Sequence, residues 1–510
     1  MLKPLLSTLL ASSLLISPFV SVSAEEKTTV TVAAPWEIAS YEPSVSGFAF
    51  HRLEVMETLV GATVQGVLKP ALATEWSAAE DGLSWSFTIR EGVVFHDGSA
   101  LDASIAAEAL NRALNKPGML KKAPIKTIKA EGKQVVVTLE KPFAALPALL
   151  THATTVITAP ASLNAEGSHT AAIGTGPFKV EKFTPPQGVV LKRNDNYWGE
   201  NATLEKVSYL AASRGETRTL LAESGDADVV FSLAPSGFTH LSSVDSVNTQ
   251  AVAIPRAVTL KLNAGHAFLN DTRARQALSL AIDRDGIAKA IVRFPEASAT
   301  QLFPPALDKW HSADVSPLTQ DIEKAKSLLA ELGWKRGEDG ILVRNGERFK
   351  LLLRTFPDRP ELPLIAAALQ DQWKAIGVEL EVSVSNYSEI PAGHKDGSLH
   401  VALFARNYGL TPDPIGTVLA DFGPGGGDWG SMGWKNADVA EALEKISVTS
   451  DADKRSESIA VVVNALQTEL PMIPVVWYQH TVSVAKDLNG FVVDPLERTY
   501  GLSDVSWDTK

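Results

Sequence analysis

Segments with the patterns of strands and of helices alternate along almost the whole chain, and this alternation constrains the fold more than any other feature. Residues 85–90 (WSFTIR) place apolar side chains at every second position, which is typical of a half-buried strand. Asp102 stands where a helix cap is expected, and residues 321–332 carry an apolar stripe at helical spacing that ends at Gly333. The later patterns predict a helix over 273–290 and strands over 258–263, 400–404 and 473–478. Alternating strands and helices predict open α/β sheets with crossover connections.

The first 24 residues have the features of a cleaved export signal. Lys3 supplies a positive start, residues 5–20 are mostly apolar, and Ala24 ends a run of small side chains. A membrane anchor is the alternative, but the run contains several Ser and a Pro and is shorter than the ~20 apolar residues that a bilayer requires. We therefore expect a periplasmic protein secreted through a cleaved signal peptide. Because no Cys stands at the cut, we expect no lipid anchor.

The composition excludes several classes of function. The chain has no Cys, which rules out disulfides, thiol nucleophiles and thiolate metal sites. Its formal net charge of −12 argues against nucleic acid and against anionic membrane surfaces as partners. A hydrophobic fraction of 45% is ordinary for a globular protein, and the length suffices for two or three domains.

Several segments resemble, in this order, the extracytoplasmic solute-binding proteins of family 5, which serve dipeptide, oligopeptide and nickel ABC importers. The resemblance rests on LKPALATEW (68–76), EDG (80–82), FTIR (87–90), VFHDG (94–98), GTGPF (174–178), NDNYWG (194–199), and residues 273–285 and 330–334. One such motif alone would be weak evidence, whereas the ordered series is spread over most of the chain.

The resemblance implies an α/β fold: a two-lobed periplasmic-binding-protein clamp of class II type, with an extra α/β domain inserted in the first lobe. Residues 25–55, 175–260 and 480–510 would form the first lobe, 56–174 the inserted domain and 261–479 the second lobe. A ligand that contacts both lobes stabilises the closed form of such a clamp, and closure presents the surface that the transporter recognises. The resemblance thus implies a monomeric, non-enzymatic protein without a cofactor, which delivers a small molecule to an inner-membrane ABC permease with its ATPase subunits.

Two loops carry the charged candidates for ligand binding. Peptide-binding members of the family hold the peptide amine with an Asp three residues before an Asp-Pro pair, but that position here is Leu410, which cannot balance an ammonium group. Asp413, in the pair itself, is the nearest carboxylate, with shaping of the turn as its alternative role. Arg359 resembles the Arg-Pro loop of dipeptide binders and suits a carboxylate, unless it pairs on the surface with the acidic residues at 358 or 361.

Three polar or aromatic candidates follow the expected strand over 400–404. Arg406, Asn407 and Tyr408 lie there, and the carboxyl ends of strands are where open α/β sheets bind ligands. Tyr408 falls where nickel-type relatives carry a Trp, so it is a candidate aromatic floor. Arg406 has a structural pairing with Asp413 as its alternative.

Two more aromatic residues complete the candidate set. Trp429 lies in a Gly-rich loop over 423–434 and is a candidate lid, while Tyr41 lies near the start of the first lobe. For both side chains, and for the loop itself, a purely structural or solvent-exposed role is the alternative.

Metal and catalytic sites find little support in the sequence. The ten histidines show no HxH or HExxH spacing, and the loop after the Asp-Pro pair lacks the His that nickel-type relatives place there, so we expect no metal bound directly by the protein. A secreted hydrolase is one alternative, but no G-x-S-x-G occurs; a periplasmic chaperone or signalling receptor is another. The hypothesis is capture of a short peptide or a peptide-like, acid-bearing small molecule. A metal-chelator complex is the alternative ligand, since its carboxylates could meet Arg359 or Arg406.

Overall fold

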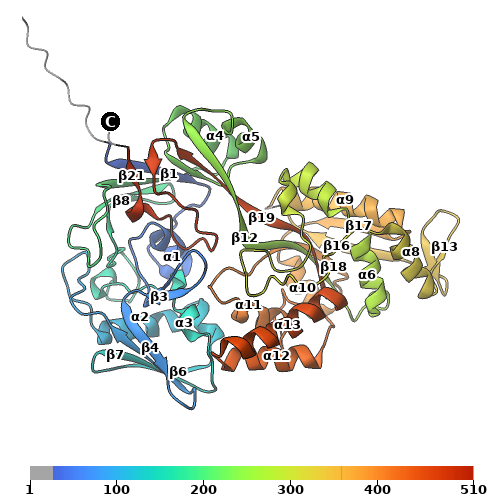
Figure 1. Ribbon diagram of the computed structural model, residues 1–510, viewed down its shortest axis with the longest axis horizontal. Helices are drawn as coiled ribbons and strands as arrows, with labels where there is room; N and C mark the ends of the chain where they lie inside the picture. The colour runs from blue at the N-terminus through green and yellow to red at the C-terminus, as the bar shows by residue number, and fades with distance from the viewer. Residues whose placement is uncertain (1–26, 358, 425, 509–510) are drawn as a thin grey trace, which may run out of the picture.

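A ten-stranded mixed sheet runs through the molecule and joins its two lobes (Figure 1). The computed structural model describes residues 27–357, 359–424 and 426–508, so the expected signal peptide lies outside the described residues. The strand order is β17-β16-β18-β12-β19-β11-β1-β10-β9-β8. Its strands are β1 (Thr29–Ala34), β8 (Phe178–Thr184), β9 (Gly188–Arg193), β10 (Lys206–Ala211), β11 (Val229–Phe231), β12 (Val247–Leu262), β16 (Lys350–Thr355), β17 (Glu379–Val384), β18 (Val401–Asn407) and β19 (Met472–Ala485).

The long strands β12 and β19 pair antiparallel and cross from one lobe to the other (Figure 1). Their register shifts between Ala253 and Ala257, on either side of Pro255, which has no N–H to donate to the ladder. The sequence predicted strands only over 258–263 and 473–478. In β12 the predicted portion is buried on both faces, whereas most of its first half is only half-buried and carries a weaker apolar pattern. In β19 residues 480–484 are buried as well, but His480, Thr481 and Ser483 interrupt the apolar run there.

Each lobe has helices packed around its part of the sheet. In the first lobe β1 runs parallel to β10 and β11, and in the second lobe β16 runs parallel to β17 and β18. The first lobe has α1 (Pro43–Arg52), α4 (Gly215–Ser224) and α5 (Pro235–Leu241). The second lobe has α6 (Thr272–Leu280), α7 (Arg284–Ile287), α8 (Ile322–Glu331), α9 (Glu361–Ala375), α10 (Glu389–Asp396), α11 (Ile415–Phe422), α12 (Ala437–Val448) and α13 (Ala452–Glu469), with the small sheet β13 (Lys335–Arg336), β14 (Leu342–Arg344) and β15 (Glu347–Arg348). The α/β fold class expected from the alternating patterns is confirmed.

A separate four-stranded sheet lies between β1 and β8 in the sequence. Its order is β4 (Ala73–Ala78), β5 (Ser84–Ile89), β7 (Gln134–Leu139) and β6 (Ile125–Glu131), and α2 (Ala103–Leu114) packs on β6 and β7. Asp102 caps α2 as predicted, since its carboxylate accepts a hydrogen bond of 2.8 Å from the Ile105 N–H. The same region holds β2 (Val60–Ala62), β3 (Leu68–Pro70) and α3 (Leu146–Leu149), and the chain ends with β20 (Leu488–Asn489) and β21 (Ser506–Trp507).

Two of the family-like segments, 174–178 and 194–199, meet at one carboxylate. Glu57 accepts hydrogen bonds from the Thr175 hydroxyl (2.8 Å), the Tyr197 hydroxyl (3.0 Å) and the Trp198 indole N–H (2.8 Å). A Cβ on Gly174 would lie 2.0 Å from the Val55 carbonyl oxygen, so only glycine permits this approach of the two backbones. These motif residues therefore fasten the region of the four-stranded sheet to the first lobe.

The helix expected over 273–290 is wrong in its length. α6 ends at Leu280, and Asp283 caps a second helix, α7, through a 2.8 Å hydrogen bond from the Gly286 N–H. A short polar side chain that bonds the backbone ahead of it competes with helix continuation, and this bond starts a new helix instead.

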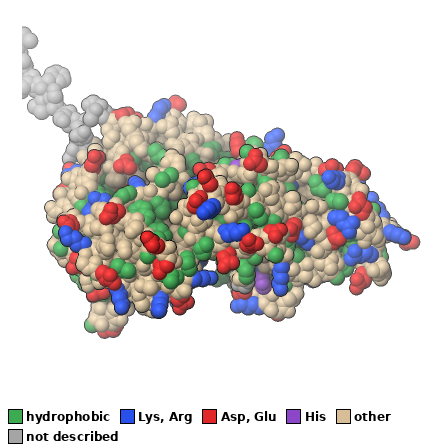
Figure 2. Space-filling view, turned by 60° about the horizontal axis from the view of Figure 1, so that its bottom comes forward, with side chains coloured by type: hydrophobic (Ala, Val, Ile, Leu, Met, Phe, Trp, Pro, Cys, Tyr) green, Lys and Arg blue, Asp and Glu red, His purple; other side chains and the backbone are tan. Residues whose placement is uncertain are grey.

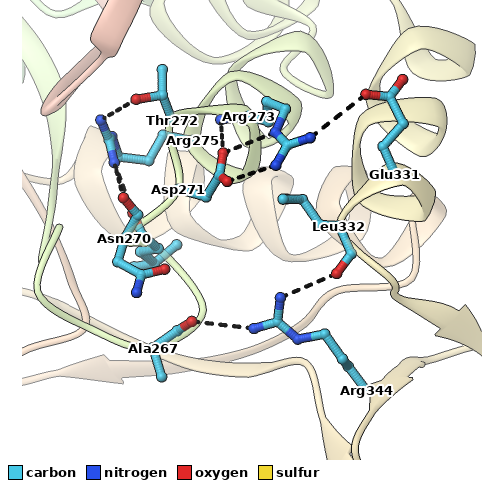
Figure 3. A network of polar contacts seen from close by, with 10 residues as sticks. Ala267, Asn270, Asp271, Thr272, Arg273, Arg275, Glu331, Leu332 and Arg344 are labelled. Carbon is cyan, nitrogen blue, oxygen red and sulfur yellow. Dashed lines mark hydrogen bonds and ion pairs between the residues drawn. The ribbon is translucent and has the colours of Figure 1, made fainter.

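A network of charged side chains secures the start of α6 (Figure 3). The buried Arg275 donates to the Leu269 carbonyl (2.9 Å), the Asn270 carbonyl (3.3 Å) and the Thr272 hydroxyl (2.9 Å), and it also reaches the Glu469 carbonyl (2.8 Å). Backbone carbonyls outside regular structure thereby gain partners. The resemblance over 273–285 thus also rests partly on a structural residue.

The proposed division into a first lobe (25–55, 175–260, 480–510), an inserted domain (56–174) and a second lobe (261–479) stays a prediction. Two of its cuts, at 260/261 and 479/480, fall inside the continuous strands β12 and β19. Within the described residues, no helix combines the length and the apolar character that crossing a membrane requires.

Candidate functional site

A cavity of about 110 Å³ lies between the end of α1 and the chain near 496–498 on the first-lobe side and the end of β18 on the second-lobe side. We call it the interlobe cavity. It is lined by Phe48, His51, Arg52, His152, Ala153, Asn407, Gly409, Leu410, Leu496, Glu497 and Arg498. Since both lobes contribute to its wall, a ligand bound here would contact both.

Glu497 links the interlobe cavity to the crossing strands. Its carboxylate lies 3.0 Å from a guanidinium nitrogen of Arg256, which is on β12, and 3.4 Å from one of Arg52, which ends α1. Burial opposes ionisation of Glu497, but the attraction of Arg256 and Arg52 outweighs it and lowers the pKa of Glu497 to about 2. The carboxylate is therefore charged at neutral pH and holds two guanidinium groups at the junction of the lobes.

Two imidazoles in the cavity wall are held neutral. Burial lowers the pKa of His152 to about 4 and, reinforced by nearby cationic groups, that of His51 to about 3. The Thr154 N–H donates to His152 Nδ1 over 3.1 Å, so the neutral ring carries its proton on Nε2. His152 therefore offers the cavity a hydrogen-bond donor.

Asn407 and Arg498 add further donors. The Asn407 Oδ1 accepts from the Gly409 N–H over 2.8 Å, which leaves its amide nitrogen for another partner. Arg498 forms a buried ion pair with Asp494 at 3.0 Å, yet its buried Nη1 has no hydrogen-bond partner among the described residues. A buried polar group without a partner calls for a water or a ligand atom. The wall thus presents more donors than acceptors.

The two sides of the molecule also touch through residues that do not line the interlobe cavity. The Ala144 N–H donates to the Ser447 carbonyl at the end of α12 over 2.7 Å, and the Lys122 side chain lies against Gly416 of α11. In the space-filling view the lower edge of the molecule is notched between its wider and narrower parts, with charges of both signs around the notch (Figure 2). The described conformation is one in which the second lobe and the region of the four-stranded sheet are in contact.

The structure brings one of the predicted ligand-binding residues, Asn407, into the wall of this cavity. Arg406 and Asn407 belong to β18, which extends to Asn407, so the prediction that both follow the strand is wrong. Antiparallel pairing with β12 lengthens it, Ala257 facing Arg406 in the ladder. Arg406 pairs with the fully buried Asp421 over 2.7 Å, not with Asp413. Tyr408 is fully buried and packs edge-on against Phe303.

The other four candidates each contact different residues. Arg359 is half-buried and donates to the Tyr478 hydroxyl over 3.2 Å, on a crossing strand. Asp413 pairs with Arg455 and accepts from the Ile415 N–H at the start of α11 over 3.0 Å, in keeping with a turn-shaping role. Trp429 packs edge-on against Phe404, and Tyr41 packs between Phe50 and Phe183. Ligand contact by these residues stays a prediction.

Sequence reasoning missed His51, Arg52, His152, Glu497 and Arg498. None of them stands in a motif with a recognisable spacing, and Arg52 and Glu497 lie 445 positions apart. They come together only because the C-terminal segment packs on the first lobe. The resemblance predicted this packing but did not indicate which side chains would meet there.

Comparisons with known proteins agree with this geometry. Residues 67–429 match the family described as bacterial extracellular solute-binding proteins, family 5 Middle. The chain is 26% identical to the nickel-binding periplasmic protein of Escherichia coli over 97% of both chains, and 25% identical to the dipeptide-binding protein of the same bacterium over 84% of both. The crystal structure of NikA from Brucella suis in complex with Fe(III)-EDTA superposes on the chain with a TM-score of 0.86 and 21% identity. The match covers 94% of this chain and 100% of NikA.

These matches confirm the two-lobed clamp fold and the expectation of a binding protein rather than an enzyme. The E. coli nickel-binding relative, matched over nearly its full length, is named as periplasmic. Since the family model matches well over half of the chain, the chain belongs to the bacterial extracellular solute-binding proteins of family 5.

Proposed function

We propose that this chain captures a small carboxylate-bearing molecule, a short peptide or a peptide-like acid, in the interlobe cavity and delivers it to an inner-membrane ABC permease. The surplus of hydrogen-bond donors in the cavity wall carries the proposal. His152 Nε2, the Asn407 amide and Arg498 Nη1 remain available after the local hydrogen bonds are made. A carboxylate has two oxygens that accept several hydrogen bonds and donate none, so it complements this wall.

The charge around the interlobe cavity also favours an anionic group. Four guanidinium groups, those of Arg52, Arg256, Arg359 and Arg498, lie near three carboxylates, those of Glu361, Asp494 and Glu497. With both imidazoles neutral, one positive charge is left over, which matches one carboxylate of a ligand. Burying a carboxylate without such a counter-charge would cost several kcal/mol, of order 2–5.

The size of the cavity limits how much of the ligand it holds. Pockets that enclose a whole drug-sized ligand measure roughly 300–1,000 Å³, whereas the interlobe cavity measures about 110 Å³. In this conformation it has room for the acidic end of a peptide, and the lobes separate further to admit the rest. Opening about β12 and β19 at the register shift near Pro255 would provide that movement.

A metal-chelator complex is the second candidate ligand. His51 lines the interlobe cavity, is held neutral, and its ring nitrogens make no hydrogen bond within the described residues. A neutral imidazole can fill an open coordination position of a metal whose other positions a chelator occupies. Two of the relatives are named for nickel or for an Fe(III)-EDTA complex.

Native mass spectrometry of the protein purified from its own periplasm tests the ligand class. We expect a bound mass that matches a peptide or another organic acid. Titration calorimetry should then show binding of a dipeptide with a free carboxylate and at least tenfold weaker binding of its amidated form. A sugar or a bare metal ion as the sole bound species, or equal affinity for the amidated dipeptide, would refute the proposal.

Export and assembly complete the proposal. We infer cleavage after Ala24, release into the periplasm without a lipid anchor, and a monomeric state. Amino-terminal sequencing of the secreted protein should begin at Glu25, and light scattering should give the mass of one chain. A dimer mass, or a first residue inside the apolar run over 5–20, would contradict it.

A further inference from the structure

A second cavity, of about 170 Å³, lies between the start of α1, the end of α2 and the segment over 154–169. We call it the α1–α2 cavity. It shares no lining residue with the interlobe cavity, and the second lobe contributes nothing to its wall. Figure 1 shows α1 and α2 on the first-lobe side of the molecule. Whatever binds here therefore does so independently of the contact between the lobes.

Arg112, in the last turn of α2, gives this cavity its chemical character. Its Nη2 is buried and has no hydrogen-bond partner among the described residues, and no ion pair of its guanidinium occurs there either. Burial lowers the pKa of Arg112, although nearby acidic groups, Glu108 and Glu42, oppose the shift. A buried guanidinium nitrogen without an acceptor is rare in a folded protein and calls for a bound partner.

The remaining charges in the wall leave a net positive charge. Lys116 Nζ lies 3.8 Å from Glu42 Oε2, while the Glu42 carboxylate is already held by His169 Nδ1 (3.2 Å) and by the Ser44 hydroxyl (3.2 Å). Burial lowers the pKa of His169, with its bond to Glu42 opposing. Two cations and one carboxylate of the lining, with His169 neutral, thus sum to one positive charge.

Part of the remaining wall is apolar, beside the polar side chains of Ser44, Asn115, Thr154 and Thr158, and the space is small. Ala109, Ala113, Val156 and Pro43 line the cavity beside Arg112. A cavity of about 150 Å³ is large enough for benzene, so this one admits a molecule of roughly that size. We propose that the α1–α2 cavity binds a small organic monocarboxylate, with the carboxylate on Arg112 and Lys116 and the apolar body against the alanines. A guanidinium fork matches a carboxylate through two parallel hydrogen bonds, which favours this group over a neutral one.

Benzoate is a suitable probe, with benzamide as its uncharged counterpart of the same shape. Equilibrium dialysis of the mature chain should show benzoate binding, with benzamide at least tenfold weaker. The crystal structure of the benzoate complex should place the ring in the α1–α2 cavity. Equal binding of the two compounds, no benzoate binding at millimolar concentration, or benzoate located only in the interlobe cavity would each overturn the proposal.

Variants separate this site from the interlobe cavity. Arg112→Gln should weaken benzoate binding at the α1–α2 cavity at least tenfold, whereas Lys129→Gln, at an exposed position on β6, should leave it unchanged. The urea midpoint of each variant checks that the fold is intact, and the benzamide comparison on the unaltered chain tests the site even if Arg112→Gln unfolds. Inorganic phosphate should compete at least tenfold less well than benzoate. Equal competition by phosphate would show a site for bare anions and refute the organic acid.

Discussion

The junction at Glu57 and the interlobe cavity both gather buried polar groups, but they satisfy them in opposite ways. At the junction, one carboxylate accepts from Thr175, Tyr197 and Trp198, and every donor of this set has its acceptor. In the cavity, Arg498 Nη1 is buried without a partner among the described residues. The Asn407 Oδ1 accepts a hydrogen bond from the Gly409 N–H, whereas the Asn407 amide nitrogen remains available to donate.

This difference shows which residues indicate the fold and which indicate the ligand. A fully satisfied cluster contributes stability and leaves no valence for a ligand, so the motifs that meet at Glu57 report the fold. A cluster with unpaired donors destabilises the ligand-free protein, and a ligand that supplies the missing acceptors removes this destabilisation. The residues that identify the family and the residues that select the ligand are therefore different residues.

Breaking the junction should have the largest effect. Glu57→Ala removes the acceptor of three hydrogen bonds and leaves three part-buried donors unpaired, which should lower the free energy of unfolding by about 3–5 kcal/mol. Urea denaturation measures the change. Glu91→Ala, which removes an exposed carboxylate paired with the exposed Lys133, should leave the urea midpoint unchanged. An equally small change for Glu57→Ala would show that the junction does not hold the two regions together.

The next change acts on the cavity. His152→Ala removes the Nε2 donor and should weaken binding of a carboxylate ligand by about 1.5–3 kcal/mol, the range for a hydrogen bond to a charged group. Titration calorimetry with the ligand identified from the periplasm measures it. Arg359→Ala is the matched test of the other candidate carboxylate site, beside Tyr478, and should cost less. A larger loss for Arg359→Ala than for His152→Ala would move the carboxylate site from the interlobe cavity to that loop.

Local rules predicted much of the fold correctly. The helix cap at Asp102 and the helix end at Gly333 follow from short-range chemistry, and the structure confirms both. Gly333 follows the C-cap of α8 in the left-handed conformation. The full length of β12 could not be predicted, because Pro255 interrupts its pattern and its ladder partner β19 lies more than two hundred positions away. Strands whose pairing depends on distant segments carry only part of their signal in their own residues.

The candidate site could be predicted less well, for the same physical reason. Arg406 stands at a sequence position that suggests ligand contact, but Asp421 takes its charge through a buried ion pair that no local pattern indicates. Arg498 has no motif around it, and its unpaired nitrogen arises from its surroundings in three dimensions. A binding site built from donors and acceptors that lack a partner within the protein can be recognised only once the protein's own hydrogen bonds are known.

Acidification provides a third test, through an imidazole near the interlobe cavity. His480 is buried between Trp36 and Phe231, and burial lowers its pKa to about 4, with Arg52 and Arg256 acting in the same direction. Below the unfolded pKa of about 6.5 the unfolded chain takes up a proton that the folded one does not, so stability falls as the pH drops from about 6.5 towards 4. Between pH 6.5 and 5 this group alone should cost about 1.5 kcal/mol, because the unfolded imidazole is already half protonated at pH 6.5.

The variant His480→Phe isolates that contribution. Both ring nitrogens of His480 are buried without a hydrogen-bond partner among the described residues, so a phenyl ring loses no bond there. The difference in unfolding free energy between the two proteins should shift in favour of the variant by about 1.5 kcal/mol from pH 6.5 to pH 5. His240→Phe, at an exposed His paired with Glu223, is the control and should show no such shift. Parallel pH profiles for His480→Phe and the unaltered chain would contradict the burial argument.

Substitution of Asn407 should have the smallest effect, and it tests directly whether the donors of the interlobe cavity serve a ligand. Asn407 is the predicted ligand-binding residue that lines the interlobe cavity, and its Oδ1 is committed to the Gly409 N–H. Asn407→Ala should therefore reduce stability and ligand affinity each by about 0.5–1.5 kcal/mol, because it removes one local bond and one donor to the ligand. Asn407→Asp keeps the acceptor for Gly409 but replaces the donor with a negative charge. If the ligand presents a carboxylate here, the Asp variant should bind it more weakly than the Ala variant while unfolding at a higher urea concentration. If the Asp variant both unfolds at a higher urea concentration and binds the ligand more tightly than the Ala variant, Asn407 stabilises the loop and does not contact the ligand.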